Sequence, residues 1–396
     1  QVQSSDFIVE ELGPQWECKI SSEENIGKTP NMTGLDTSIA KDFLLCEMEK
    51  KDIDHFRARK ELASEIRKGT DAIGFAGIKD KKAHTSQRLS IFKPDIEKIQ
   101  SFSHPNIYLK NFRWGKRKIK LGYLIGNRFT VTLREIEKKE GTKVTNKIRK
   151  VKNFANYFGK QRFGSVRGNN AEFGKLLVKK KFKEFIWQML THTSNNEQEE
   201  VTAARERLAK EGDFKEALNF FPEYLRLERS ILSFIIESNE DYVKVIRRCE
   251  RKSILLYIHA LQSKIFNEIL STALAHDIDF TKKGQMRIPL FGYKSIIDEG
   301  ELGEIEEEIL RQNGIKREDF KIPELSYLSV KGDYRLALIN INNLEVTSED
   351  DEIYSNAKKI ILKFDLPSGV YATTFLENFF DLIEEKDPTI LNTDKH

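Results

Sequence analysis

The chain has 396 residues, of which 32% are charged, and a formal net charge of +4. This length exceeds the usual size of one hydrophobic core, so we expect two domains. The sequence holds no apolar stretch of the roughly 20 residues that a membrane-spanning helix needs, and residues 1–11 do not resemble a signal peptide, which argues against a membrane protein. The three cysteines, Cys18, Cys46 and Cys249, are widely spaced and odd in number, which favours a reducing compartment, and we predict the cytoplasm.

The first 150 residues predict mixed β and α structure. Residues 43–49 and 127–134 alternate between apolar and less apolar side chains, as half-buried strands do. Asp54 is a candidate N-cap for a helix that runs to Arg67 and is closed by Gly69. The residues predicted along one stripe of this helix are Phe56, Arg59, Leu62, Ala63 and Ile66. The other elements predicted here are a strand over residues 88–92 and a helix over 143–157.

The middle of the chain changes character, because helical spacing dominates from about residue 165 to 280. The clearest helical patterns are residues 200–210, 224–236 and 254–275. Glycine-punctuated stretches near 284–293 and 321–340 predict a few strands, and strand and helix patterns return at 360–366 and 372–385. This order predicts an α+β fold in which a helix-rich insertion interrupts a sheet domain.

Basic residues gather in one stretch although the net charge is small. Residues 110–152 hold 15 lysines and arginines against three acidic residues. A segregated charge of this kind could steer a polyanion toward the protein. An ordinary lysine-rich solvated surface would give the same sequence pattern. Within the stretch, basic residues alternate with Trp114 and Ile119, which predicts a strand with one basic face toward RNA. The basic residues of this face are Arg113, Lys116, Arg117, Lys118 and Lys120.

Several common chemistries find no support in the sequence. It contains neither a phosphate-binding loop of the Gly-x-x-x-x-Gly-Lys-Ser/Thr type nor a Gly-x-Ser-x-Gly elbow. The seven histidines show no metal-ligand spacing, so no metal site and no cofactor is predicted.

The segment with most chemical content is residues 77–87, which read GIKDKKAHTSQ. One carboxylate, that of Asp80, stands among Lys79, Lys81 and Lys82. Nearby cations favour the ionised form of a carboxyl group, which is the form that acts as nucleophile or base, and the same lysines could hold a phosphate beside it. By itself, however, an aspartate among lysines in a glycine-rich turn is most often an ordinary solvated residue.

This segment resembles the Gly-x-Lys-Asp-x-x-Ala-x-Thr-x-Gln signature of the TruD family of pseudouridine synthases, in an archaeal-type sequence. Further motifs of that family follow in the family's order, so the resemblance spans residues 6 to about 380. They are residues 6–10 (DFIVE), 117–122 (RKIKLG), 126–129 (GNRF), 133–135 (LRE), 156–164 (NYFGKQRFG), 261–267 (LQSKIFN) and 364–373 (FDLPSGVYAT). The family usually has Lys or Arg five positions before the Asp-Phe pair, where this chain has Gln1.

The resemblance implies roles for single residues. Asp80 is the expected catalytic carboxylate, which attacks either the ribose or the base so that the glycosidic bond is remade to carbon. Phe129 is expected to stack on the uracil, Asn127 to hold the Asp80 loop, and Phe7 to line the apolar pocket, with Lys79 also at the substrate. Without the resemblance, the alternation of side chains would predict that Phe129 and Phe7 are core residues and that Asn127 lies in a turn before a strand.

Residues 156–164 are expected to be structural, with Lys160 and Arg162 as further candidates for phosphate contacts. The resemblance implies a catalytic domain of residues 1–156 and 335–396, with a mixed, largely antiparallel sheet, and an insertion domain of residues 157–334. The implied function is isomerisation of a uridine in structured RNA, with uridine 13 of tRNA as the expected target. No obligatory protein partner is predicted. The alternative is a catalytically inactive RNA-binding or RNA-chaperone protein of the same fold.

Overall fold

The computed structural model describes residues 3–39, 41–164, 166–281 and 287–380. These residues form two compact units, which are described separately. Unit 1 contains the chain up to Phe154 and again from Asn340, and unit 2 contains Ala155–Ile339. The chain thus leaves unit 1 once and returns to it once, the connectivity of an inserted domain. The domain boundaries drawn from the sequence, at 156/157 and 334/335, stay a prediction.

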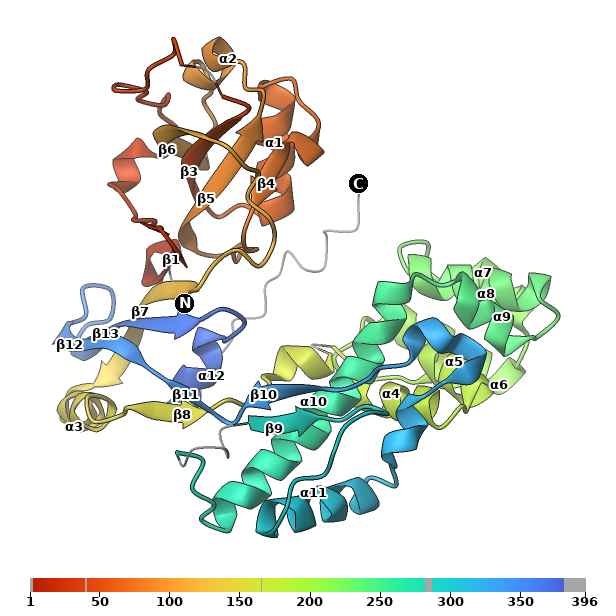
Figure 1. The fold of residues 1–396 in the computed structure, drawn as a ribbon. Coiled ribbons are helices and arrows are strands. Elements are labelled where there is room, and N and C mark those ends of the chain that lie inside the picture. The colour runs from red at the N-terminus through yellow and green to blue at the C-terminus, as the bar shows by residue number, and fades with distance from the viewer. Residues whose placement is uncertain (1–2, 40, 165, 282–286, 381–396) are drawn as a thin grey trace. The chain divides into compact units, whose positions relative to one another are not determined.

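Unit 1 is built on a mixed sheet, which has nine strands within the described part of the chain. Its main path runs β12-β13-β7-β1-β5-β3-β6, with β2 beside β1 and β4 beside β5 (Figure 1). β1 and β5 are parallel, and the other pairings are antiparallel, so the predicted α+β class is confirmed. The strands are β1 (Phe7–Gly13), β2 (Trp16–Glu17), β3 (Phe43–Lys51), β4 (Ile73–Phe75), β5 (His84–Phe92), β6 (Ile107–Gly115), β7 (Gly126–Glu137), β12 (Asn342–Asp350) and β13 (Ala357–Pro367).

The helices of unit 1 are short, and α1 packs on the sheet beside β3, β4 and β5 (Figure 1). The side chain of Asp54 accepts hydrogen bonds from the backbone N–H groups of Phe56 and Arg57, so the predicted N-cap is confirmed. The ring of Phe56 is exposed, and the helix buries His55 and Ala58 instead. The helices are α1 (His55–Glu65), α2 (Ile96–Gln100), α3 (Lys138–Ile148) and α12 (Ala372–Leu376), with 3₁₀ turns at Ser4–Asp6, Glu23–Asn25 and Thr70–Ala72.

Two sequence-based predictions about helix ends are wrong. Helix α1 does not end on Gly69, because the left-handed residue that follows its C-cap is Arg67.

The φ angle of Arg67 is 51°, in the left-handed region where a helix commonly stops. The helix predicted over residues 143–157 is instead α3, which starts earlier and ends at Ile148, followed by strand β8 (Asn153–Ala155). Strand β8 is only three residues long, too short to show a spacing of its own, and its pairing with β11 (Leu338–Asn340) decides for the strand.

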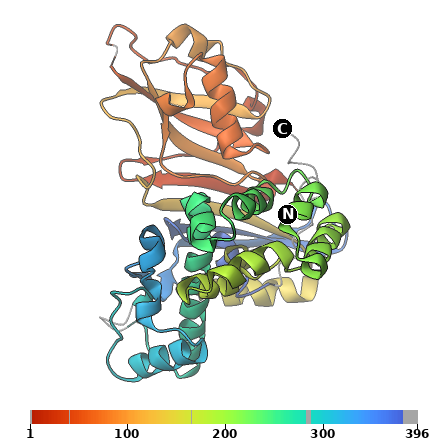
Figure 2. The ribbon, with the colours of Figure 1, turned by 90° about the vertical axis from the view of Figure 1, so that its right-hand side faces the viewer.

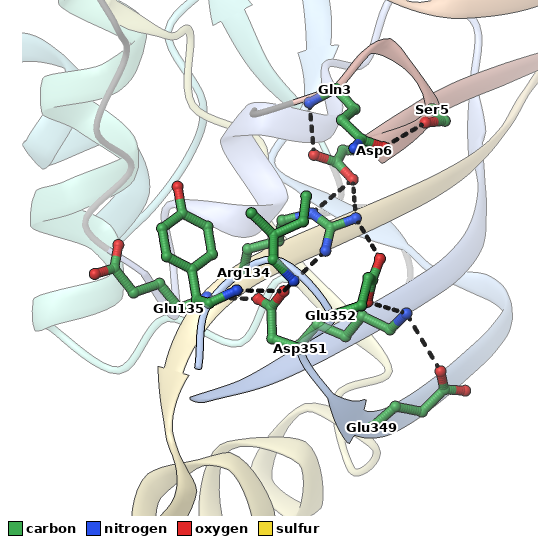
Figure 3. A network of polar contacts seen from close by, with 11 residues as sticks. Gln3, Ser5, Asp6, Arg134, Glu135, Glu349, Asp351 and Glu352 are labelled. Atoms are coloured by element: carbon green, nitrogen blue, oxygen red, sulfur yellow. Dashed lines mark hydrogen bonds and ion pairs between the residues drawn. The ribbon is translucent and has the colours of Figure 1, made fainter. Parts of the chain in front are cut away.

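A half-buried ionic cluster around Arg134 ties three segments of unit 1 together (Figure 3). Its guanidinium group donates from Nε to Asp6 Oδ1 at 2.9 Å and from Nη1 to Asp351 Oδ1 at 3.0 Å. Asp351 also accepts from the backbone N–H of Glu135 at 3.1 Å, and Glu352 pairs with Arg134 at 3.0 Å. The hydrogen bond to Asp6 is the first cause that raises the pKa of Arg134 above its usual range. Two sequence motifs, those containing Asp6 and Arg134, thus meet in a structural contact.

Unit 2 is mostly helical (Figure 2) and is organised around the long helix α10, which is labelled in Figure 1. The helical patterns over residues 200–210, 224–236 and 254–275 are confirmed as α6, α8 and α10. The helices are α4 (Asn170–Val178), α5 (Phe182–Thr191), α6 (Glu199–Glu211), α7 (Phe214–Phe220), α8 (Arg226–Glu237), α9 (Tyr242–Arg248), α10 (Arg251–Ala275) and α11 (Glu301–Gln312), with 3₁₀ turns at Lys160–Phe163, Arg317–Phe320 and Pro323–Leu328. Strands β9 (Arg287–Leu290) and β10 (Asp333–Leu336) pair with each other, and the part of the predicted 284–293 strand before Arg287 lies outside the described residues.

Two further sequence motifs meet inside unit 2. Asn267 of α10 accepts from the backbone N–H of Phe158 at 2.8 Å and donates to the Phe158 carbonyl at 2.9 Å. Arg162 donates from Nε to the hydroxyl of Ser263, also on α10, at 3.1 Å. The guanidinium group of Arg335 lies 4.0 Å from the centre of the Phe158 ring. Residues 156–164 and 261–267 therefore stabilise each other in the fold.

The last part of the chain is described only as far as residue 380. Strand β13 confirms the pattern at residues 360–366 and extends it at both ends. Helix α12 covers the start of the helix predicted over residues 372–385, whose end lies outside the described residues. Within the described residues, no helix combines the length and apolar character that spanning a membrane requires.

Candidate active site

Asp80 lies on the loop that joins β4 to β5, and its side chain is exposed. β5 begins four residues later, at His84, and runs parallel to β1 in the middle of the sheet. The loop therefore emerges at the N-terminal end of a central strand. A Cβ atom on Gly77 would lie 2.9 Å from Lys79 Nζ, so a larger residue there would displace the lysine ammonium group.

Three buried side chains from three different strands hold this loop. Gln87 of β5 donates from Nε2 to the carbonyl of Gly77 at 3.0 Å. Glu11 of β1 accepts from Lys79 Nζ at 2.8 Å. Lys50 of β3 donates to the backbone carbonyl of Asp80. The backbone on both sides of the exposed carboxylate is thus fixed by the rigid sheet, while the carboxylate itself faces outward.

Lys50 is fully buried and also donates to the carbonyl of Ile53 at 2.9 Å. Burial lowers the pKa of Lys50 to about 8, and the negative charge of Asp80 acts in the opposite direction. The Asp80 loop therefore has a positive charge beneath it at neutral pH.

His55 supports the same loop from a second layer. Its Nδ1 lies 3.2 Å from Gln87 Oε1. Because the amide nitrogen of Gln87 donates to Gly77, its oxygen is the acceptor, which assigns the proton of the neutral imidazole to Nδ1. Burial lowers the pKa of His55 to about 4, so the ring is neutral at physiological pH.

This pKa has a measurable consequence for stability. An unfolded histidine, with a pKa of about 6.5, takes up a proton between pH 6.5 and 4, whereas folded His55 does not. We therefore expect the free energy of unfolding to fall by up to about 3 kcal/mol from this residue as the pH drops through that window. Urea unfolding of the parent protein and of His55→Gln at pH 7 and pH 4.5 measures the effect. The variant should lose less stability than the parent, and equal losses would contradict the assignment.

An aromatic face of the sheet lies beside these anchors. Residue pairs in neighbouring strands share a face, and Val9 pairs with Phe129 while Glu11 pairs with Asn127. Phe129 is only 5% exposed, and its ring centre lies 5.9 Å from that of Phe7. On its other side it stacks on Phe364 of β13, at 5.7 Å and an interplanar angle of 27°. The face that carries Glu11 therefore also carries Phe7, Asn127 and Phe129.

Asn127 is one of several residues in the described part of the chain that carry a buried polar atom without a hydrogen-bond partner. Its side-chain oxygen is buried and has no hydrogen-bond partner among the described residues. A buried polar atom without a partner costs free energy, so such atoms are rare unless a ligand or a water completes them. Its place opposite Glu11 puts this acceptor on the face that holds the Asp80 loop.

The structure brings together most of the residues singled out in the sequence, with two changes. Lys79 is only 4% exposed and forms an ion pair with Glu11. Lys81 and Lys82, by contrast, are exposed. Glu11 is not among the residues predicted from the sequence, in which the first motif covers residues 6–10. The spacing Asp-Phe-x-Val-x-Glu, counted from Asp6, in fact reaches Glu11. Gln1 lies outside the described residues.

The basic candidates take different positions from those expected. The predicted basic strand is wrong beyond Gly115, where β6 ends, so the next four basic residues lie on a loop. All five candidates of this stretch are exposed: Arg113, Lys116, Arg117, Lys118 and Lys120. Lys160 of unit 2 is exposed, whereas Arg162 is half-buried against Phe158 and Ser263.

Comparison with known proteins decides the family. The family described as tRNA pseudouridine synthase D (TruD) matches this chain over residues 1–286 and 280–379. The chain belongs to the TruD family. TruD proteins are isomerases. This chain is therefore an enzyme of that class, and it has the fold of a pseudouridine synthase.

Relatives of this TruD protein match it over most of their length. A protein of Methanocaldococcus jannaschii named "Probable tRNA pseudouridine synthase D 1" is 32% identical, over 96% of this chain and 94% of its own. A protein of Methanopyrus kandleri with the name "Probable tRNA pseudouridine synthase D" is 33% identical, over 83% of both chains. The crystal structure of a TruD protein from Methanosarcina mazei has a TM-score of 0.80 and 27% identity, and the match covers 96% of this chain and 93% of that one.

Proposed function

We propose that this TruD protein isomerises uridine 13 of tRNA to pseudouridine and that Asp80 is the catalytic carboxylate. The observation that carries the proposal is the setting of Asp80. Its carboxylate is exposed on a loop whose backbone is fixed by Gln87 and Lys50, on the sheet face that also carries Phe129. A reactive group needs this combination of access and fixed position.

The reaction moves one bond and changes no oxidation state. The carboxylate of Asp80 forms a bond to either the ribose or the base, and the bond between the base nitrogen and the ribose breaks. The ribose carbon is then joined to C5 of the uracil, and the bond to Asp80 breaks again, which regenerates the carboxylate. C5 then loses its proton, and a ring nitrogen carries one in the product, so atoms balance without a co-reactant.

The target base must first leave its stack, at a cost of a few kcal/mol. Phe7 and Phe129 lie on the face beside the Asp80 loop and offer apolar contact to the extruded uracil. The unpartnered oxygen of Asn127 supplies a hydrogen-bond acceptor for an N–H group, on the loop or on the uracil. Lys79 holds the loop through Glu11 in this proposal and does not contact the phosphate.

The exposed basic loop after β6 is the proposed phosphate-binding surface of unit 1. Lys116, Arg117, Lys118 and Lys120 are exposed on it, and backbone charges dominate the affinity of proteins for RNA. Lys160, in unit 2, is a separate candidate for phosphate contact.

The test is position-specific. Purified protein incubated with an unmodified tRNA transcript should form one pseudouridine, at position 13, mapped by a chemical reaction specific for that nucleoside. A transcript with cytidine at position 13 should bind equally well and gain no pseudouridine. Modification at another uridine would reject the proposed site, and tRNA binding without modification would favour an inactive RNA-binding protein.

A further inference from the structure

A row of exposed apolar side chains borders the Asp80 loop. Residues 121–125, here called the rim, expose Leu121 by 69%, Tyr123 by 50% and Ile125 by 59%. Ile78, on the Asp80 loop itself, is also exposed. Large apolar side chains usually avoid water, so a group of them next to a reactive loop indicates a contact surface.

The rim is fixed to the loop and to the sheet. The backbone N–H of Gly122 donates to the carbonyl of Ala76 at 2.8 Å, and that of Ile125 donates to Leu12 at 2.9 Å. Leu124, the half-buried member, packs at Gly77, where an added Cβ would meet its Cδ1 at 3.3 Å. Gly122 has a φ of 86°, which lets the chain turn there. The exposed side chains therefore stand at a set position beside Asp80.

Tyr123 is the aromatic member of the rim. Its ring centre lies 5.6 Å from that of Trp16 at an angle of 44°, and the Arg88 guanidinium lies 5.5 Å from the Trp16 ring. Trp16 thus supports one side of Tyr123, while half of the tyrosine remains open to solvent. A supported, half-exposed ring is well suited to stack against a planar partner.

The charge around the rim identifies the class of that partner. No acidic residue occurs from Lys110 through Arg134, and the basic loop ends directly at the rim. Exposed cations followed by exposed aromatic and aliphatic side chains are how proteins hold unpaired nucleic acid: cations meet phosphates and rings meet bases. A second protein with an apolar face would gain nothing from this excess of positive charge.

We propose that the rim binds the unpaired nucleotides next to the target uridine and that Tyr123 stacks on one of their bases. This inference rests on the proposed function, because it assumes that RNA reaches Asp80. When the target base leaves its stack, its neighbours lose a stacking partner, and Tyr123 replaces it. The rim is thereby a substrate-binding surface separate from the uracil pocket.

The experiment uses the full chain with Asp80→Asn, so that RNA binding is measured without turnover. The probe is an unmodified tRNA transcript carrying 2-aminopurine beside the target uridine, on either side in turn. Tyr123→Ala should weaken binding at least about fivefold, the lower end expected for one stacked base. The bound 2-aminopurine should also be brighter than with tyrosine present. Tyr123→Phe should restore both values to within about twofold, because stacking requires the ring and not the hydroxyl group.

Phe92→Ala is the matched control, because Phe92 is an exposed aromatic residue at the far end of β5. It should leave affinity and fluorescence unchanged. Unchanged binding by Tyr123→Ala, failure of phenylalanine to restore it, or a change of oligomeric state on sedimentation would each overturn the rim proposal. Activity of the Asp80→Asn protein would overturn the proposed function alone, since the stacking signal is read independently of turnover.

Discussion

Asp80→Asn is expected to abolish pseudouridine formation, by at least about 10³-fold, while tRNA affinity stays within about twofold of the parent. Asparagine has nearly the shape of aspartate but lacks the carboxylate that attacks. The loop does not depend on this side chain, because its anchors are the carbonyls of Gly77 and Asp80 and the side chain of Lys79. Single-turnover rates and filter-binding affinities on one tRNA transcript measure the two quantities.

The matched control for this variant is Asp277→Asn. Asp277 is exposed in unit 2 and has a φ of 56°, a conformation that asparagine tolerates well. It should keep both rate and affinity. A rate for Asp80→Asn within tenfold of the parent would reject the carboxylate as the attacking group. Loss of tRNA binding together with the rate would instead assign Asp80 to substrate binding.

Periodicity predicted the elements in which burial follows a regular spacing. β3, β7 and α10 were found in this way because alternate residues, or residues three and four apart, face one core. It failed where a tertiary contact decides. Phe56 fits an apolar stripe by spacing, yet its helix turns His55 and Ala58 inward. The basic residues after Gly115 alternate as a strand would, but no neighbouring strand pairs with them in the described sheet.

In the site, too, the residues of one short segment could be predicted from the sequence, whereas their contacts with distant residues could not. Asp80 and its lysines are visible as one short segment, and family resemblance singles them out. The burial of Lys79 depends on its ion pair with Glu11, which is 68 residues away in the sequence. The position of the Asp80 carbonyl depends on its hydrogen bond from Lys50, which is 30 residues away. No local pattern distinguishes a buried lysine from the exposed Lys81 beside it. The order of the strands in the sheet brings these residues together, and the local spacing of residues does not predict that order.

Lys79→Met is expected to lower the free energy of unfolding by about 3–5 kcal/mol, because it leaves the carboxylate of Glu11 buried without its cation. That carboxylate has no exposed surface and would keep only the backbone N–H of Arg88, at 3.2 Å. Adding Glu11→Gln should restore most of the stability, since the neutral amide removes the buried charge and still accepts from Arg88. Urea unfolding of the two single variants and the double variant gives the coupling energy.

The same variants separate a loop anchor from a phosphate ligand. If Lys79 contacted phosphate, its loss would reduce the slope of log affinity against log salt by about one. We expect the Lys79→Met/Glu11→Gln protein to keep the slope of the parent. The paired replacement of the exposed Lys116 and Arg117 by Met should reduce it by about two. An equal effect of both pairs would place Lys79 at the RNA, and the sheet would then anchor the Asp80 loop through Lys50 and Gln87 alone.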